Sequence, residues 1–119
     1  MAKILVLDDM AETVVLIQTI LGTKGHDVTG FTDEEQAIAY ARSRDVDLLI
    51  LDVKLKKLSG LDVLREIKRL QPQVKAMILT GYPSLESARE AKDLGVQEYC
   101  IKPMEKEELE EKAAQVLAS

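Results

Sequence analysis

Short, purely apolar runs alternate along this chain with longer amphipathic stretches. The clearest runs are residues 4–7 and 48–51, and neither carries a polar side chain on either face. A strand that is apolar on both faces belongs inside a parallel sheet that is covered on two sides. Strands that alternate with helices are joined by right-handed crossovers. The pattern therefore predicts an α/β fold with helices on both faces of one parallel sheet.

The alternation continues along the chain without a linker or an internal repeat. A shorter, more polar run at 28–31 indicates an edge strand, and two further strands are predicted at 74–79 and 99–101. Helical spacing of apolar residues predicts helices at about 14–21, 33–44, 60–70, 84–94 and 105–117. Thr32-Asp33-Glu34-Glu35 offers an N-cap followed by acids in the first turn, and Ser84 is a second N-cap. We expect a doubly wound, flavodoxin-like sheet with strand order 2-1-3-4-5.

Composition limits the class of protein. The chain has 119 residues, 46% hydrophobic and 31% charged, which predicts a single domain over residues 1–119. A net charge of -5 argues against a nucleic-acid surface, which is usually basic. Cys100, the one cysteine, falls in a predicted strand and is expected to be an inert, reduced core thiol. No apolar run approaches the length of a membrane span, so we expect a cytoplasmic protein with no membrane partner.

Charged residues stand where three of the predicted strands end. Asp8 and Asp9 follow the first strand, Asp52 the third and Lys102 the fifth. Ligands of open parallel sheets bind outside these carboxyl ends, so we expect the four side chains to converge. Three crowded carboxylates need a cation, and Mg²⁺ prefers oxygen ligands. The predicted ligands are Asp9 and Asp52 directly, Asp8 through water, and the backbone carbonyl of Lys54.

Beside a metal, a carboxylate can also act as a nucleophile and form an aspartyl-phosphate. Asp52 suits this role because it stands alone at its strand end, facing the acidic pair. Phosphoryl transfer depends mainly on positioning and on electrostatic stabilisation. Lys102 would supply a charge to one phosphoryl oxygen and the Thr80 hydroxyl a hydrogen bond to another. The predicted catalytic set is therefore Asp52, Thr80 and Lys102.

The order of these motifs resembles the receiver domain of two-component response regulators. The residues that carry the resemblance span the chain: Asp8-Asp9, Asp52 with Gly60, Thr80, and Lys102-Pro103 after Tyr99. The resemblance implies phosphoryl transfer from a sensor histidine kinase or phosphotransfer protein to Asp52, which becomes a 4-aspartylphosphate. It implies Mg²⁺ on Asp9, Asp52 and the Lys54 carbonyl, and a cis Lys102–Pro103 peptide.

The same resemblance implies a switch rather than an enzyme, since such a domain catalyses only its own phosphorylation and dephosphorylation. Thr80 would move toward the phosphoryl group and Tyr99 would change rotamer. These movements would alter the surface of the fourth helix, fifth strand and fifth helix. That surface would bind a target protein or a second copy of the chain, with no direct nucleic-acid contact.

The segment after Asp52 departs from the commonest family pattern. Leu55-Lys56 stands where the family often has Met-Pro, so the segment lacks the rigidity of proline. Lys54 and Lys57 are expected to form a basic rim beside the acidic pocket. Lys54 and Tyr82 occupy positions that tune the access of hydrolytic water in the family. We therefore predict a long-lived phosphate on Asp52.

Two other functions use similar residues. An aspartyl-phosphate phosphatase has a comparable acid cluster and lysine, but its pattern places a second aspartate two residues after the nucleophile, where this chain has Lys54. A degenerate receiver could serve only as a protein-binding scaffold, but all five key positions are present.

Taken singly, several residues have simpler explanations. Asp8 and Asp9 would cap a helix, Tyr99 would be a half-buried aromatic, and His26 would face solvent without a role in phosphotransfer. Most of the apolar residues of the fourth and fifth predicted helices are expected to lie in the core: Leu85, Ala88, Ala91, Ala113 and Val116.

Overall fold

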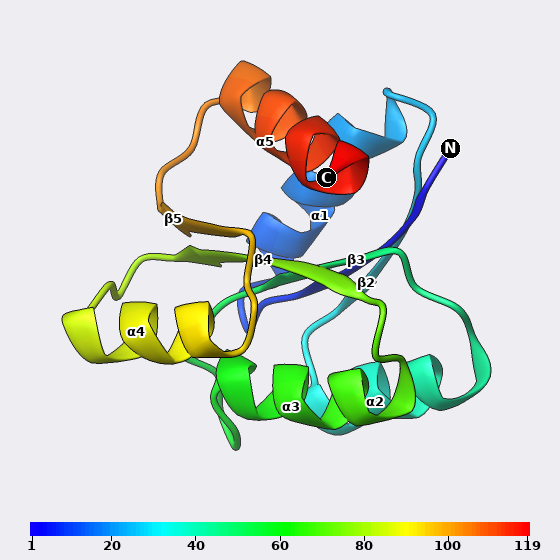
Figure 1. Ribbon diagram of the computed structural model, residues 1–119. Coiled ribbons are helices and arrows are strands. Elements are labelled where there is room, and N and C mark those ends of the chain that lie inside the picture. Colours follow the sequence, from blue (N-terminus) through cyan, green and yellow to red (C-terminus); the bar gives the residue numbers. More distant parts are fainter.

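A sheet of five parallel strands runs through the centre of the molecule (Figure 1). The computed structural model describes residues 1–119. None of its helices combines the length and the apolar character of a bilayer-spanning segment. The elements in chain order are β1 (Lys3–Leu7), α1 (Ala11–Gly22), β2 (Asp27–Phe31), α2 (Glu34–Ser43), β3 (Leu48–Leu51), α3 (Gly60–Leu70), β4 (Lys75–Thr80), α4 (Leu85–Asp93), β5 (Glu98–Ile101) and α5 (Lys106–Ala118).

The strand order is β2-β1-β3-β4-β5, as predicted, with β2 at one edge. Successive side chains of a strand point to opposite faces of the sheet. Leu5 and Leu7 of β1 accordingly pack with α2, α3 and α4, whereas Ile4 and Val6 pack with α1 and α5. Figure 1 shows the two layers of helices on either side of the sheet. Burial on both faces is the reason that the central strands are apolar throughout.

The helix starts follow local hydrogen bonding. Asp33 accepts the Gln36 N–H at 3.0 Å and Ser84 accepts the Ser87 N–H at 3.0 Å, so both predicted N-caps are confirmed. Ser59 caps α3 in a reciprocal capping box with Asp62. These caps fix where each helix begins relative to the strand before it.

The end of β4 lies one residue later than predicted. Thr80 is the last residue of the strand and pairs with Ile101 of β5. The Lys102 N–H then donates to the Thr80 carbonyl at 2.8 Å, and the Lys102–Pro103 peptide is cis, as the resemblance implied. Thr80 and Lys102 are therefore neighbours at the carboxyl edge of the sheet.

Burial confirms the expectation for most of the apolar residues of α4 and α5 and corrects the expectation for His26. Leu85 is 68% exposed, whereas Ala91, Ala113 and Val116 are buried. The face of α4 that packs on the sheet is defined by Ser87 and Ala91, four residues apart, and Leu85 lies off that stripe. His26 is half-buried rather than solvent-facing, because its Nδ1 accepts the Ala2 N–H at 3.2 Å.

Cys100 behaves as a core residue. It is buried, and burial raises the pKa of its thiol above the ordinary value. A higher pKa leaves less of the reactive thiolate. The expectation of an inert core thiol is consistent with this position.

Candidate functional site

The acids at the ends of β1 and β3 meet at one point. Leu7 and Leu51 pair in register, so the residues that follow them emerge side by side. Carboxylate oxygens of Asp8, Asp9 and Asp52 lie within 4.8 Å of one another. Asp8 and Asp52 are buried, and Asp9 is half-buried. Three oxygen ligands at this spacing form a group that could hold a hard divalent cation.

Lys102 reaches this cluster from the end of β5. Its Nζ donates to Asp8 Oδ2 at 2.6 Å and to Asp52 Oδ2 at 2.9 Å. Burial by itself lowers the pKa of Lys102, but the hydrogen bonds to the two carboxylates outweigh burial and hold the pKa above its ordinary value. Lys102 is therefore a firmly charged ammonium that bridges the two buried acids.

One ammonium does not compensate the cluster fully. Burial raises the pKa of Asp8 above its ordinary value, and the nearby Asp52 charge adds to this effect. Hydrogen bonds from Lys102 and from the Met10 N–H act in the opposite direction without cancelling it. Ionisation of Asp8 therefore destabilises the folded state, and a further positive charge near its carboxylate would reduce this destabilisation.

We predict that Asp8→Asn stabilises the metal-free protein by about 0.5 to 2 kcal/mol at neutral pH, because it removes this desolvated charge. The folded pKa of Asp8 is raised, so the stability of its protonated form is present below the ordinary value of 3.8 and is lost as pH rises through the folded pKa. The advantage of the variant should shrink as pH falls. The difference in the free energy of unfolding between the variant and the wild type is measured by urea unfolding in the presence of a chelator. A variant less stable than the wild type at neutral pH would contradict the prediction.

A hollow of about 370 Å³ opens beside the acids. It is lined by Asp9, Met10, Asp52, Lys54, Gly81, Tyr82 and Lys102. The Lys54 N–H donates to Asp52 Oδ1 at 3.2 Å, and the Lys54 Nζ lies 4.3 Å from the centre of the Tyr82 ring. Both members of this cation–π pair line the hollow.

Lys57 does not join the expected basic rim. Its Nζ lies 2.8 Å from Glu35 and 3.5 Å from Asp33, so it pairs with the start of α2 instead of facing the hollow. Of the two lysines expected at the rim, only Lys54 lines the hollow.

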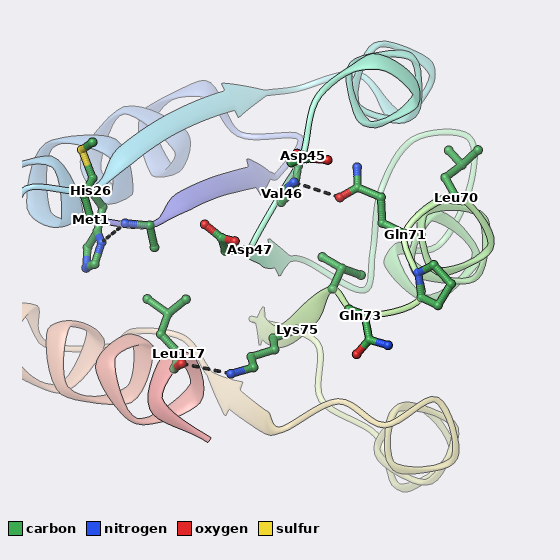
Figure 2. A pocket seen from close by; sticks show the side chains of 13 residues that line it. Met1, His26, Asp45, Val46, Asp47, Leu70, Gln71, Gln73, Lys75 and Leu117 are labelled. Carbon is green, nitrogen blue, oxygen red and sulfur yellow. Dashed lines mark hydrogen bonds between the residues drawn. The ribbon is translucent and has the colours of Figure 1, made fainter.

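The largest hollow of the molecule is elsewhere. It measures about 750 Å³ and lies at the amino ends of the strands, where Figure 2 shows His26, Gln71 and Lys75 around it. Several of its polar groups are already paired: Gln71 accepts the Val46 N–H at 2.9 Å, and Lys75 donates to the Leu117 carbonyl at 2.9 Å. The acids that could hold a metal are all at the opposite end. Chemistry rather than size therefore identifies the candidate site.

The two residues implied in the switch occupy different places. Thr80 is buried beside Lys102, and its Oγ1 accepts the Tyr82 N–H at 3.1 Å. Tyr99 is half-buried and shares a hydrogen bond of 2.6 Å with the Ser87 hydroxyl. Its hydroxyl also accepts the Ser84 N–H at 3.3 Å. Tyr99 is therefore tied to the start of α4 and not to the acids.

Two residues contribute in ways that sequence reasoning did not foresee. A Cβ on Gly60 would lie 1.9 Å from the Asp52 carbonyl oxygen, so α3 begins directly against the backbone of Asp52. Glu34, interpreted as a first-turn acid of α2, is 1% exposed and accepts the N–H groups of Lys57 and Leu58. Backbone amides carry no sequence signature, so no pattern could have identified this contact.

Comparisons with known proteins agree with this geometry. Residues 4–114 match the response regulator receiver domain family. The chain is 35% identical over 115 residues to the transcriptional regulatory protein ZraR of Escherichia coli O157:H7, which covers 97% of this chain and 26% of that protein. It is 26% identical over 107 residues to sporulation initiation phosphotransferase F of Bacillus subtilis, which covers 90% of this chain and 86% of that protein.

The fold comparison gives the same result. A CheY-like response regulator receiver domain protein from Methanospirillum hungatei JF-1 superposes with a TM-score of 0.95 at 27% identity, covering 99% of this chain and 94% of that one. The Vibrio cholerae chemotaxis protein CheY4 superposes with a TM-score of 0.91 at 25% identity, covering 98% of each chain. Sequence and fold thus lead to one conclusion: this chain belongs to the receiver domain family of two-component response regulators.

Proposed function

We propose that Asp52 is the phosphoacceptor of this receiver domain. The observation that carries the proposal is that the Asp52 carboxylate lines the hollow. Its Oδ1 accepts a hydrogen bond from the Lys54 N–H and its Oδ2 accepts one from the Lys102 ammonium. One carboxylate oxygen would form a bond to phosphorus while the bond from phosphorus to a histidine nitrogen of the donor breaks. The donor is a sensor histidine kinase or a phosphotransfer protein.

We further propose Mg²⁺ as the ion of the acidic cluster, with Asp9, Asp52 and the Lys54 carbonyl as ligands and Asp8 bound through water. The spacing of the carboxylates and their excess negative charge support this assignment. The bound ion would neutralise charge that develops on the phosphoryl oxygens. Lys102 and the Thr80 hydroxyl are the protein groups placed to meet the remaining oxygens.

The readout we propose runs from Thr80 to α4. A phosphoryl group on Asp52 adds strong acceptor oxygens, and Thr80 would turn its hydroxyl toward them, with Tyr99 changing rotamer in response. Leu85 of α4 and Ile101 of β5 are 68% and 56% exposed on the affected surface. This surface would bind a target protein or a second copy.

Three further features complete the proposal. Residues 1–119 would act as one domain. This domain would catalyse only its own phosphorylation and dephosphorylation and would turn over no external substrate. The chain covers only 26% of the length of ZraR. A cytoplasmic location would suit phosphoryl transfer from a kinase and a thiol such as Cys100 that stays reduced.

The direct test treats the protein with a small phosphoryl donor and Mg²⁺ and follows intact mass. We expect an adduct of one phosphoryl group that is stable to acid, labile to base and blocked by a chelator. A wild-type protein that forms no such adduct would overturn the proposed function. Steady hydrolysis of small phosphate esters would instead support a phosphatase.

The Lys54–Tyr82 pair is expected to lengthen the life of the phosphate, because both side chains line the hollow beside Asp52 and would hinder the approach of water to a phosphoryl group there. Replacing both residues with alanine should speed dephosphorylation by about tenfold, which corresponds to about 1.4 kcal/mol in the barrier. Tyr82→Phe keeps the ring and serves as the control, with an unchanged rate expected. A double variant that loses phosphate no faster than the wild type would contradict this prediction.

A further inference from the structure

The segment between β3 and α3 carries Lys54 and has few internal restraints. Its ends are held, since the Gly60 N–H donates to the Val53 carbonyl at 2.8 Å and Ser59 is part of the capping box of α3. Between these ends, residues 55–58 make no backbone–backbone hydrogen bond. No proline restricts the dihedral angles of these four residues, whose sequence is Leu-Lys-Lys-Leu.

Glu34 provides the missing restraint from the neighbouring helix. Its Oε2 accepts the N–H groups of both Lys57 and Leu58, the latter at 2.8 Å. These are the hydrogen bonds that the backbone of residues 55–58 makes. Figure 1 shows α2 and α3 side by side on the same face of the sheet, which brings the start of α2 close to this segment.

The burial of Glu34 is costly unless it is compensated. The side chain belongs to a residue that is 1% exposed, and no lysine or arginine forms an ion pair with it. A buried carboxylate is tolerated where N–H groups satisfy its oxygens. Burial raises the pKa of Glu34, but the hydrogen bonds from Leu58, from its own N–H and from Lys57 outweigh burial, and the pKa is lowered. The carboxylate therefore stays charged and holds both amides.

We propose that Glu34 is a positioning residue: its buried carboxylate fixes the segment after Asp52, and so the Lys54 carbonyl. Loss of Glu34 would leave the three aspartates of the cluster in place but would increase the conformational freedom of the Lys54 carbonyl. The proposed Mg²⁺ ligands would then be less well preorganised. This inference rests on the proposed function.

The test compares Glu34→Gln with Glu35→Gln in the full chain. Glu35 is the adjacent acid, and its side chain is 75% exposed where it contacts the Lys57 Nζ, so it controls for the loss of one negative charge. Mg²⁺ affinity is measured by chemical-shift titration with Mg²⁺ alone. Local opening is measured by hydrogen exchange of the Lys57 and Leu58 amides.

In Glu34→Gln we expect faster exchange at both amides and Mg²⁺ affinity lower by about tenfold, in the range typical for partners that orient metal ligands. Glu35→Gln should bind Mg²⁺ like the wild type. If Glu34→Gln does not fold, Glu34→Asp carries the test, because its shorter carboxylate keeps the charge but cannot reach both amides.

Rescue separates positioning from stability. Adding Lys56→Pro to Glu34→Gln should recover most of the Mg²⁺ affinity, because proline restricts the segment and the Lys56 N–H has no backbone partner to lose. A purely structural role would lower stability without changing Mg²⁺ affinity and would show no rescue, and either result overturns the inference. Wild-type protein that neither binds Mg²⁺ nor becomes phosphorylated would overturn the proposed function instead.

Discussion

Asp52→Asn is expected to abolish the base-labile phosphoryl adduct completely while leaving the fold intact. The amide has the size of the carboxylate, and its oxygen can still accept the Lys54 N–H that Asp52 Oδ1 accepts at 3.2 Å. Lys102 keeps its bond of 2.6 Å to Asp8. The amide oxygen is not a competent nucleophile toward phosphorus, so the covalent step has no acceptor. Intact mass after incubation with a small phosphoryl donor and Mg²⁺ measures the loss.

The control for this prediction is Asp45→Asn, an exposed aspartate beside the hollow at the amino ends of the strands. It changes the net charge by the same amount and should form the adduct like the wild type. An adduct that persists in Asp52→Asn would move the phosphoacceptor to Asp8 or Asp9. Circular dichroism of both variants establishes that a lost adduct is not a lost fold.

Gly60→Ala is expected to destabilise the fold by about 3 kcal/mol, at the upper end of the usual cost of overpacking. The new Cβ would lie 1.9 Å from the Asp52 carbonyl oxygen and 2.8 Å from its carbon. Both backbones are held: the Asp52 N–H donates to the Leu7 carbonyl at 3.1 Å and the Gly60 N–H to the Val53 carbonyl at 2.8 Å. Relief of the clash must therefore break hydrogen bonds. Urea unfolding measures the change.

Gly22→Ala is the matched control, because a Cβ there meets nothing within 4 Å at the end of α1. This substitution should leave the stability of the fold unchanged or raise it by about 0.5 to 1 kcal/mol, since alanine has a higher helix propensity than glycine. If Gly60→Ala unfolds at the wild-type urea concentration, the start of α3 can move away from Asp52, and the contact is not the reason for a glycine at that position.

The fold could be predicted well where burial is symmetrical. Strand β3 was predicted to the residue, because a fully apolar run between Asp47 and Asp52 has only one way to lie in a two-sided sheet. The end of β4 was placed one residue early, because the apolar run stops at Leu79 although the backbone of Thr80 still pairs with Ile101. Leu85 is the exposed exception among the apolar residues expected mostly in the core, and it could not be singled out because helical spacing alone does not say which stripe of a short helix packs on the sheet.

The site could be predicted in outline for a topological reason. Strand order brings Asp8, Asp9 and Asp52 together whatever the details of side-chain packing, so their proximity followed from the order alone. The contacts that depend on backbone groups were invisible. Glu34 bonds to amides 23 and 24 residues away, and Gly60 touches a carbonyl, and neither partner is encoded by a side chain.

The bridge that Lys102 makes between Asp8 and Asp52 has a consequence for which ions the cluster selects. In formal charge, three carboxylates and one ammonium leave two negative charges. A divalent ion would bring the net charge to zero, whereas a monovalent ion would leave one negative charge and a trivalent ion one positive charge. With Lys102 in the bridge, the net formal charge of the cluster is therefore equal and opposite to that of one doubly charged ion.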